Sequence, residues 1–210
     1  MSKVLQDLSS NDYVVIDNVF SKEDYNILKK YFNDCEWSFL NETNTHSEYD
    51  LTEQEKLQDF GLVNVITVYG NTKDGLIEKA FSDNVKKFFE LDSIDRIKAG
   101  LFPPAESEII HQPHTDLTEP HWTGLYYFST EKNAGHTYIY NQRFDPFRYK
   151  NANEQLRATK DNFEIETKIE AKENRVVFFK GDVFHSSSRP RTIFKRIAIN
   201  VNFRGRPLSV

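Results

Sequence analysis

The pattern of hydrophobic and polar residues divides the chain into a helical first part and a strand-rich remainder. The stretch Tyr13–Ile16 predicts a short strand. Ser21 can serve as the N-cap of a helix that runs to about Phe32, because a carboxylate residue follows it at the third position. Apolar residues recur at helical spacing over Leu76–Glu90 and predict a second helix.

After the second helix, the sequence changes to short runs rich in β-branched and aromatic residues. The segments predicted as strands are Ile97–Phe102, Glu108–His111, His114–Asp116, Thr123–Ser129, Thr137–Tyr140, Phe163–Ile169, Arg175–Phe179, His185–Ser186 and Arg196–Phe203. This order predicts a mainly β protein with flanking helices. Its core would be a double-stranded β-helix, the cupin-like jelly-roll barrel, with the N-terminal helices packed on one sheet. The polar stretches 39–58 and 141–160 are predicted as loops, the second near the mouth of the barrel.

Length and composition limit the possible classes of protein. A chain of 210 residues predicts one domain, with an N-terminal strand and helices over 1–95 and a jelly-roll core over 96–205. The net charge of −5 argues against a nucleic-acid partner and weakly favours a neutral or cationic substrate. A membrane-spanning run and a signal peptide are both absent from the sequence, and its one cysteine cannot form an internal disulfide. We therefore expect a cytoplasmic protein without a membrane partner.

The triplet His114-Thr115-Asp116, followed much later by His185, is the strongest candidate for chemistry. Alternate residues of a strand share a face, so His114 and Asp116 can point at one ion. His185 opens another predicted strand and would supply the third ligand. Two histidines and one carboxylate form the facial triad that binds non-haem Fe(II) and leaves coordination positions open. The sequence therefore predicts that these three residues are both metal ligands and catalytic.

The other histidines are weaker candidates, because a lone histidine usually has a surface or hydrogen-bonded role. His111 and His114 could form a His-x-x-His pair, but that pair needs a helical turn, which Pro113 disfavours. On a strand, the two would face opposite ways. We therefore expect His111 to contact a ligand or the substrate, or to be structural. His121 is expected in a loop or at the rim, and His136 could face either way.

Arg196 lies eleven residues after His185 in a predicted strand. It shares one polar face of that strand with Ala198, Asn200 and Asn202. That face either meets solvent or lines the barrel, where a guanidinium could bind a carboxylate with two parallel hydrogen bonds. Arg189 and Arg191 are competing candidates that precede the strand in a turn. We expect them to meet solvent or an acidic ligand.

The order of HxD, distal histidine and arginine resembles that of the 2-oxoglutarate and Fe(II)-dependent oxygenases. Three blocks carry the resemblance, namely Glu-Ile-Ile-His-Gln-Pro-His-Thr-Asp at 108–116, Leu-Tyr-Tyr-Phe-Ser-Thr at 125–130 and Val-Val-Phe-Phe-Lys-Gly-Asp-Val-Phe-His-Ser-Ser at 176–187. They are similar to the prolyl-hydroxylase-like branch, including small bacterial and phage forms. The resemblance covers Ile97–Phe203, about half of the chain.

This resemblance implies a hydroxylase that couples the oxidative decarboxylation of 2-oxoglutarate to succinate with oxidation of a substrate C–H bond. Fe(II) would be held by the triad, and Arg196 would bind the C5 carboxylate of 2-oxoglutarate. Tyr127 would bind the same carboxylate or be a core aromatic residue. Phe102 stands where some relatives carry a tyrosine, so that contact is absent or supplied elsewhere. The resemblance also allows ascorbate as a cofactor, and peptidyl proline or a small molecule as the substrate.

Two other functions are consistent with the same residues. One is a cupin-like metal enzyme that does not use 2-oxoglutarate. The other is a jelly-roll binding module without catalytic activity, in which the polar cluster is structural. Binding of 2-oxoglutarate separates the first alternative from the oxygenase, and metal analysis of the purified protein separates the second.

Overall fold

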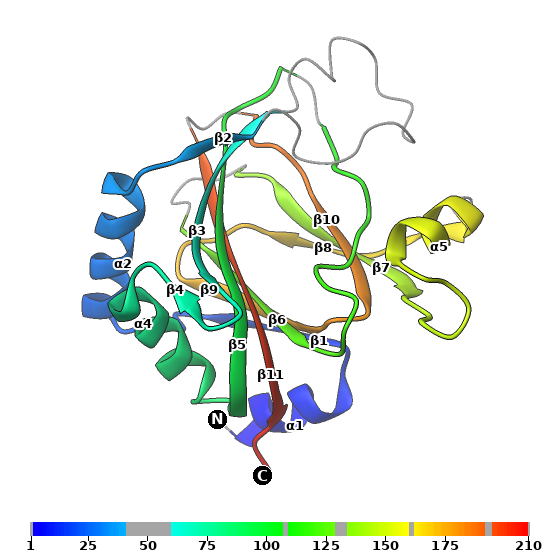
Figure 1. Cartoon of the computed structure of the whole chain (residues 1–210), viewed down its shortest axis with the longest axis horizontal. Helices are drawn as coiled ribbons and strands as arrows, with labels where there is room; N and C mark the ends of the chain where they lie inside the picture. Colours follow the sequence, from blue (N-terminus) through cyan, green and yellow to red (C-terminus); the bar gives the residue numbers. More distant parts are fainter. Residues whose placement is uncertain are drawn as a thin grey trace.

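The computed structural model describes residues 2–40, 60–106, 109–128, 134–159, 162–191 and 195–209. Two antiparallel sheets face each other, and the N-terminal helices lie beside the larger sheet (Figure 1). The helices are α1 (Ser2–Ser10), α2 (Lys22–Asp34), α4 (Gly75–Val85) and α5 (Ala152–Thr159). Among the described residues, no helix is long and apolar enough to span a bilayer.

The larger sheet has the strand order β1-β9-β6-β11-β5-β3-β2, and β4 pairs with β3. Its strands are β1 (Tyr13–Asp17), β9 (Arg175–Lys180), β6 (Trp122–Tyr127), β11 (Arg196–Pro207), β5 (Phe89–Phe102), β3 (Gly61–Val68), β2 (Ser38–Leu40) and β4 (Asn71–Thr72). The smaller sheet has the order β10-β7-β8, built from β10 (Val183–Ser187), β7 (His136–Arg143) and β8 (Ile165–Glu170). This arrangement is the jelly roll that the sequence predicts.

The two faces of the larger sheet form separate cores, because alternate residues of a strand point to opposite sides. The outer face packs against the helices in one cluster that includes Leu5, Leu28, Phe32, Phe81, Ile97, Tyr126, Phe178 and Ile199. The inner face packs against the smaller sheet through Leu125, Val177, Phe179 and Ala198, which meet Ile139, Ile169 and Val183. Polar residues of the same inner face are thereby directed into the space between the sheets.

The structure confirms where the two predicted helices begin. The Ser21 hydroxyl accepts the backbone N–H of Asp24 at 3.1 Å and caps α2. The second helix begins near the predicted position but ends at Val85 rather than Glu90. A turn follows it, and β5 begins at Phe89, eight residues before the predicted Ile97. Apolar residues at 88 and 89 fit the helical period, but they belong to the turn and the strand.

Several elements were not predicted, including α1 and the hairpin of β3 and β4. The hairpin turn has positive φ at both central residues, 45° at Tyr69 and 80° at Gly70, as a type I′ turn requires. The polar stretch 141–160, predicted as a loop, contains the end of β7 and all of α5. A buried glutamine, Gln155, fixes α5 through bonds to the backbone of Arg143 and Asp145. In the predicted loop 39–58, only residues 39 and 40 are described, and they belong to β2.

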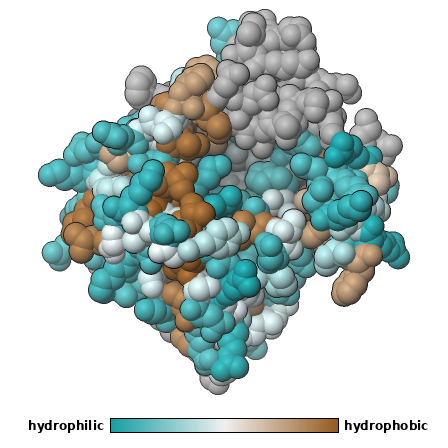
Figure 2. Space-filling view, viewed as in Figure 1, coloured by the Kyte–Doolittle hydropathy of each residue, from teal (hydrophilic) through white to brown (hydrophobic). Residues whose placement is uncertain are grey.

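Hydrophobic surface runs as a band over the region of β2, β3 and β5 in the space-filling view (Figure 2). Exposed residues of these strands include Phe39 and Val68, and the ring of Phe39 stacks on that of Phe60 at 5.9 Å. The remaining surface of this view is mostly hydrophilic.

Asn84 joins the helical layer to the sheet and tests this arrangement. Its amide donates to the carbonyl of Val19 at 2.9 Å, and the Tyr126 hydroxyl donates to its side-chain oxygen at 3.1 Å. The Asn84→Ala variant leaves both partners buried without a bond, at a cost of about 1–3 kcal/mol each. We expect the free energy of unfolding to fall by about 2–5 kcal/mol in urea denaturation.

The exposed Lys86 on the same segment supplies a control. Lys86→Ala should change the free energy of unfolding by less than about 0.5 kcal/mol. Tyr126→Phe, which removes one of the two bonds, should fall between the two variants. If Asn84→Ala is as stable as Lys86→Ala, the proposed link between helix and sheet is wrong.

Candidate active site

The two histidines of the candidate triad are joined through their backbones. His114 and His185 form an isolated antiparallel bridge, in which each backbone N–H donates to the carbonyl of the other, at 2.9 and 3.0 Å. His185 lies in β10 of the smaller sheet, and His114 lies before the loop that leads to β6. The bridge places the imidazole rings 4.5 Å apart. The backbone of one histidine therefore fixes the position of the other.

Both imidazoles have the same nitrogen available for a further partner. Nδ1 of His114 lies 3.0 Å from the Gln112 carbonyl, and Nδ1 of His185 lies 3.2 Å from the Val183 carbonyl. A carbonyl only accepts hydrogen bonds, so each Nδ1 carries a proton, and in the neutral form of the imidazole Nε2 then keeps a lone pair. Nε2 of His185 is buried and has no hydrogen-bond partner within the described ranges. A buried lone pair of this kind is suited to a metal ion.

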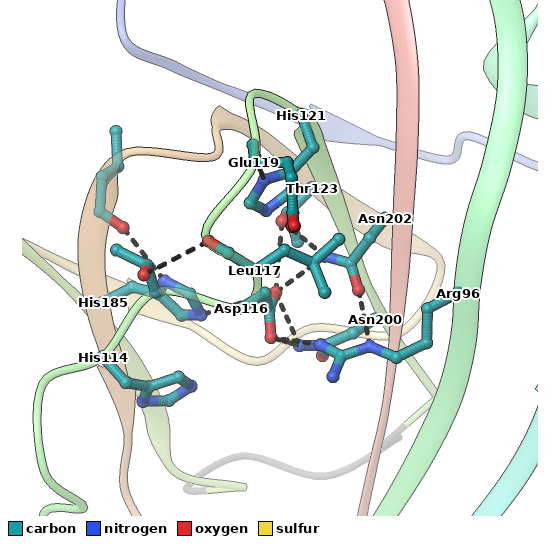
Figure 3. Close-up of polar contacts among 12 residues, drawn as sticks. Arg96, His114, Asp116, Leu117, Glu119, His121, Thr123, His185, Asn200 and Asn202 are labelled. Carbon is teal, nitrogen blue, oxygen red and sulfur yellow. Dashed lines mark hydrogen bonds and ion pairs between the residues drawn. The ribbon is translucent and has the colours of Figure 1, made fainter. Parts of the chain in front are cut away.

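The carboxylate of Asp116 is held by side chains from three strands of the larger sheet (Figure 3). Arg96 of β5 donates to one oxygen at 2.7 Å. The other oxygen accepts from Asn202 of β11 at 2.9 Å and from Thr123 of β6 at 3.1 Å. Asn200 of β11 lies 3.1 Å from both oxygens. The side chain of Asp116 is only 4% exposed, so these donors replace most of its hydration.

The environment sets the protonation states that a metal site requires. Burial alone would raise the pKa of Asp116, but the charge of Arg96 and the nearby histidines hold that pKa well below its usual range. The pKa of His185 is lowered to about 4, mainly by burial and to a lesser extent by the neighbouring His114. Near neutral pH the carboxylate is therefore ionised and the His185 imidazole is neutral, which are the forms that bind metals.

The geometry brings the three sequence-predicted ligands together. The ligand atoms of His114, Asp116 and His185 all lie within 4.8 Å of one another, and no second cluster of this kind occurs in the described part of the chain. Nε2 of His185 lies 3.9 Å from an oxygen of Asp116. Two imidazoles and one carboxylate on one side of an ion fit the facial triad of non-haem iron sites.

The triad lines a cavity of about 100 Å³ between the two sheets. Its remaining wall comes from β5, β6, β7, β10 and β11, with residues that include Lys98, Gly100, Phe102, Leu125, Thr137, Ser187, Arg196, Ala198 and Asn200. Asn200, which contacts the carboxylate of Asp116, and Arg196 are four residues apart on β11, roughly 13 Å along a strand. One cavity thus has the candidate ligands near one end and an arginine near the other.

Arg196 is buried and has no counterion among the described residues. It is 1% exposed, and its guanidinium donates to the Ser188 carbonyl at 2.8 Å and to the Thr137 hydroxyl at 3.2 Å. Its Nε is buried without a hydrogen-bond partner, and no carboxylate of the described residues forms an ion pair with it. Burial lowers the pKa of Arg196, although arginine keeps its proton in proteins. An unpaired buried charge is costly, so this end of the cavity is suited to an anion.

Tyr127 supports Arg196 through a threonine. Its hydroxyl donates to Oγ1 of Thr137 at 2.7 Å, and the guanidinium of Arg196 lies 5.7 Å from the centre of its ring. Thr137 lines the cavity, whereas Tyr127 lies behind the wall. An anion bound at Arg196 would therefore meet the hydroxyl of Thr137 and not that of Tyr127.

The predicted strand His114–Asp116 is wrong, because only His114 makes a bridge. Asp116 meets His114 because the polar face of β11 holds its carboxylate, and strand alternation plays no part. His111 was expected to face away from His114, because the two would lie on one strand. This expectation is also wrong: the segment forms no strand, and both histidines line the cavity. Nδ1 of His111 lies 2.8 Å from the Ser187 hydroxyl, and His111 is outside the ligand cluster. The predicted strand Glu108–His111 is reduced to a bridge at Ile110 in its described residues.

The structure corrects the expectation for Arg189 and confirms those for Arg191 and for the loop position of His121. Arg189 was expected to meet solvent or an acidic ligand, but it is 1% exposed and donates twice to the Pro103 carbonyl, at 3.1 and 3.2 Å. Arg191 is exposed, as expected. His121 lies in a loop before β6, but its side chain is buried and its Nδ1 lies 2.8 Å from the Glu119 carbonyl. It does not contribute to the triad.

Comparison with known proteins finds similarity in structure. No family model matches the chain, and no curated protein sequence matches it significantly. A prolyl hydroxylase from Trichoplax adhaerens aligns with a TM-score of 0.56 and 12% identity over 95% of this chain and 87% of that chain. A prolyl-4-hydroxylase from Pseudomonas putida aligns with a TM-score of 0.55 and 12% identity over 98% of both chains.

HygX from Streptomyces hygroscopicus, solved with nickel and 2-oxoglutarate, aligns with a TM-score of 0.59 and 9% identity over 97% of this chain and 86% of that chain. This chain has the fold of the 2-oxoglutarate and Fe(II)-dependent oxygenases. The likeness confirms the predicted jelly roll with helices on one sheet. In this oxygenase fold, the triad and Arg196 share one cavity between the sheets.

Sequence reasoning missed most of the groups that surround the candidate ligands. Arg96, Thr123 and Thr137 were not singled out, although each lies in or beside a predicted strand. Asn200 was placed on the face of Arg196 by strand alternation, but without a role. Lys98 shares a face of β5 with Arg96 by the same period. The alternation showed which residues share a face, but not that Asp116 would lie against that face.

Removal of a candidate ligand should abolish tight metal binding while the fold is retained. His185→Ala leaves one imidazole and one carboxylate, which cannot define a facial site. Asp116→Asn keeps the size of the side chain but removes the charge that attracts the ion. We expect either change to weaken Fe(II) binding by at least about a hundredfold in anaerobic calorimetry. Parent-like affinity in both variants would contradict the triad.

His111 gives a matched control within the same cavity. Because its Nδ1 is taken by Ser187 and it lies outside the ligand cluster, His111→Ala should leave Fe(II) affinity within about threefold of the parent. Circular dichroism checks that the fold is retained. A loss as large as that of His185→Ala would instead indicate a site that includes His111.

Proposed function

We propose that this protein is a 2-oxoglutarate and Fe(II)-dependent dioxygenase that hydroxylates its substrate. The observation that carries the proposal is the buried Arg196, which has no carboxylate partner in the described residues and shares one cavity with the triad. A metal site alone would fit many enzymes. A metal site with a buried guanidinium at the far end of its cavity fits a co-substrate that chelates metal at one end and carries a carboxylate at the other.

His114, Asp116 and His185 would hold the iron. Each Nε2 lone pair is directed by a hydrogen bond from Nδ1 to a backbone carbonyl, which fixes the tautomer and the ring orientation. Arg96, Asn200, Asn202 and Thr123 orient the carboxylate of Asp116. These contacts come from rigid strands, so the ligand set is formed in advance.

Arg196 and Thr137 would bind the C5 carboxylate of 2-oxoglutarate. Within the described part of the chain, Nε of Arg196 has no hydrogen-bond partner, and its other nitrogens donate to Ser188 and Thr137. The Thr137 hydroxyl accepts from both Arg196 and Tyr127, so its own proton is available for the carboxylate. Tyr127 acts by positioning Thr137.

When bound together, iron, 2-oxoglutarate and oxygen supply the oxidative decarboxylation of the co-substrate and the oxidation of a substrate C–H bond. The protein binds and orients the reactants and excludes water. The hydrophobic inter-sheet core around Leu125, Val177 and Phe179 borders the site and keeps it dry on its inner side. His185 itself packs against the ring of Phe179 at 4.6 Å.

The solved structures of similar fold suggest several substrate classes. The Trichoplax adhaerens enzyme was solved with a peptide fragment, and HygX was solved with hygromycin B. The same comparison includes SnoN, an α-ketoglutarate-dependent epimerase. We favour hydroxylation because the sequence blocks around the triad resemble the prolyl-hydroxylase-like branch, which leaves a peptidyl proline or a small molecule as the substrate.

The decisive experiment is the anaerobic addition of Fe(II) and 2-oxoglutarate. A weak visible charge-transfer band should form, because the keto acid would chelate the iron. A cupin-like metal enzyme would bind iron without the band. A binding module without catalytic activity would bind neither with useful affinity, and either result would reject the proposal.

Arg196→Ala should weaken 2-oxoglutarate binding while iron binding persists. Hydrogen bonds to charged groups contribute about 1.5–3 kcal/mol each, and each 1.4 kcal/mol is about tenfold in affinity. Loss of two such bonds predicts a decrease of roughly a hundredfold or more in titrations followed by the charge-transfer band. Arg196→Lys should recover part of the loss, because the charge remains but the bidentate geometry is gone.

Arg191 is the matched control, since it is exposed on the preceding turn. Arg191→Ala should bind 2-oxoglutarate like the parent protein. The buried Arg189 is unsuitable as a control, because its removal would leave the contact with the Pro103 carbonyl unmade. Parent-like affinity in Arg196→Ala would exclude Arg196 as the carboxylate anchor.

A further inference from the structure

Positive charge is concentrated at the metal end of the cavity. Arg96 and Lys98 lie on the same face of β5, opposite Asn202 and Asn200 of β11 in the strand register. Lys98 lines the cavity together with His114, Asp116 and His185. Arg196 is the only other basic residue that is described in the cavity wall, and it lies toward the opposite end of β11.

Lys98 differs from Arg96 in its contacts. Within the described ranges, no hydrogen bond or ion pair involves its ammonium group. Arg96 differs, since its guanidinium donates to Asp116 at 2.7 Å and to Asn202 at 2.8 Å. The pKa of Lys98 is lowered, mainly by burial and to a lesser extent by the charge of Arg96, while the charge of Asp116 acts to raise it. Lys98 is therefore a half-buried ammonium close to another positive charge.

The charges of the loaded site also leave Lys98 without compensation. If the protein binds Fe(II) and 2-oxoglutarate as proposed, the two positive charges of Fe(II) and the one of Arg196 are balanced by the negative charges of Asp116 and of the two carboxylates of 2-oxoglutarate. Arg96 and Lys98 are then in excess. Asp116 is the only acidic residue that the structure describes in the cavity wall, and it already serves the metal. Excess charge in a partly desolvated cavity favours an anionic ligand.

We propose that the substrate carries an anionic group, a carboxylate or a phosphate, and that Lys98 binds it at the metal end of the cavity. This inference rests on the proposed function and specifies its substrate class. It opposes the expectation from the net charge of −5 that the substrate is neutral or cationic. Surface charges are screened over about 8 Å at physiological ionic strength, whereas Lys98 lies within the cavity.

A second source of the anion is the C1 carboxylate of 2-oxoglutarate. It would bind at the metal, and Lys98 lines the same cavity. Titration of 2-oxoglutarate into the anaerobic Fe(II) form of Lys98→Gln separates the two sources. We expect an affinity within about threefold of the parent, since Lys98 is reserved for the substrate. A loss of tenfold or more would assign Lys98 to the co-substrate and overturn the proposal.

Direct binding of an anion is tested with acetate, using the neutral acetamide as its isostere. The protein is loaded with Mn(II) and saturated with 2-oxoglutarate under anaerobic conditions, and paramagnetic relaxation of the probe protons reports occupancy near the metal. In the parent protein, acetate should bind at least about fivefold more tightly than acetamide. Methylphosphonate in place of acetate shows whether a phosphate-like group is preferred over a carboxylate.

Three variants identify the residue responsible. Lys98→Gln should remove the preference for acetate, whereas Lys87→Gln, at an exposed lysine, should keep it. Lys98→Glu should reverse the preference and favour methylammonium over acetate. Equal binding of acetate and acetamide to the parent, or a preference that survives in Lys98→Gln, would overturn the proposal. These outcomes differ from failure of the proposed function, in which the parent protein would show no 2-oxoglutarate band at all.

Discussion

A charge buried inside a protein must be surrounded by hydrogen-bond donors, acceptors or opposite charges. Asp116 and Arg196 are the two most deeply buried charges that the structure describes in the wall of the cavity between the sheets. The carboxylate of Asp116 is surrounded by four donors from β5, β6 and β11. The guanidinium of Arg196 has only neutral oxygen acceptors among the described residues. The protein itself compensates the charge of Asp116, whereas the charge of Arg196 can be compensated by a bound anion. This difference is the physical basis for reading the cavity as a site for a metal and an anion.

The larger sheet makes this arrangement possible because its two faces have different tasks. On β11, Ile197, Ile199 and Val201 pack against the helices. The residues between them, which include Arg196 and Asn200, point inward to the cavity. The smaller sheet contributes His185 and, through the backbone bridge, fixes His114. A shift of one residue in the register of β11 would exchange the two sets and destroy core and site together. Fold and site therefore depend on the same strand pairing.

Much of this architecture could be predicted from the sequence, because it follows from local patterns. The cap at Ser21, the alternation along β11 and the HxD spacing each depend on neighbouring residues. The sequence could not show that Asp116 lies outside any strand and is held by Arg96, since that contact joins residues that are distant in the chain. It also misplaced Arg189, because a turn containing proline and arginine looks solvent-exposed, yet Arg189 is buried against Pro103. The role of Lys98 depends on which charges surround it, and only the folded structure brings those charges together.

On the proposed mechanism, the triad and Arg196 bind the two ends of one molecule. A series of keto acids measures that separation directly, with pyruvate, oxaloacetate, 2-oxoglutarate and 2-oxoadipate titrated into the anaerobic Fe(II) protein. All four can chelate iron, but their distal groups end at different distances from the metal. If the triad and Arg196 bind the two ends, 2-oxoglutarate should bind most tightly, at least about tenfold more tightly than pyruvate, which lacks the distal carboxylate. Equal affinity for pyruvate and 2-oxoglutarate would mean that Arg196 takes no part in binding, and it would exclude a shared ligand between Arg196 and the triad.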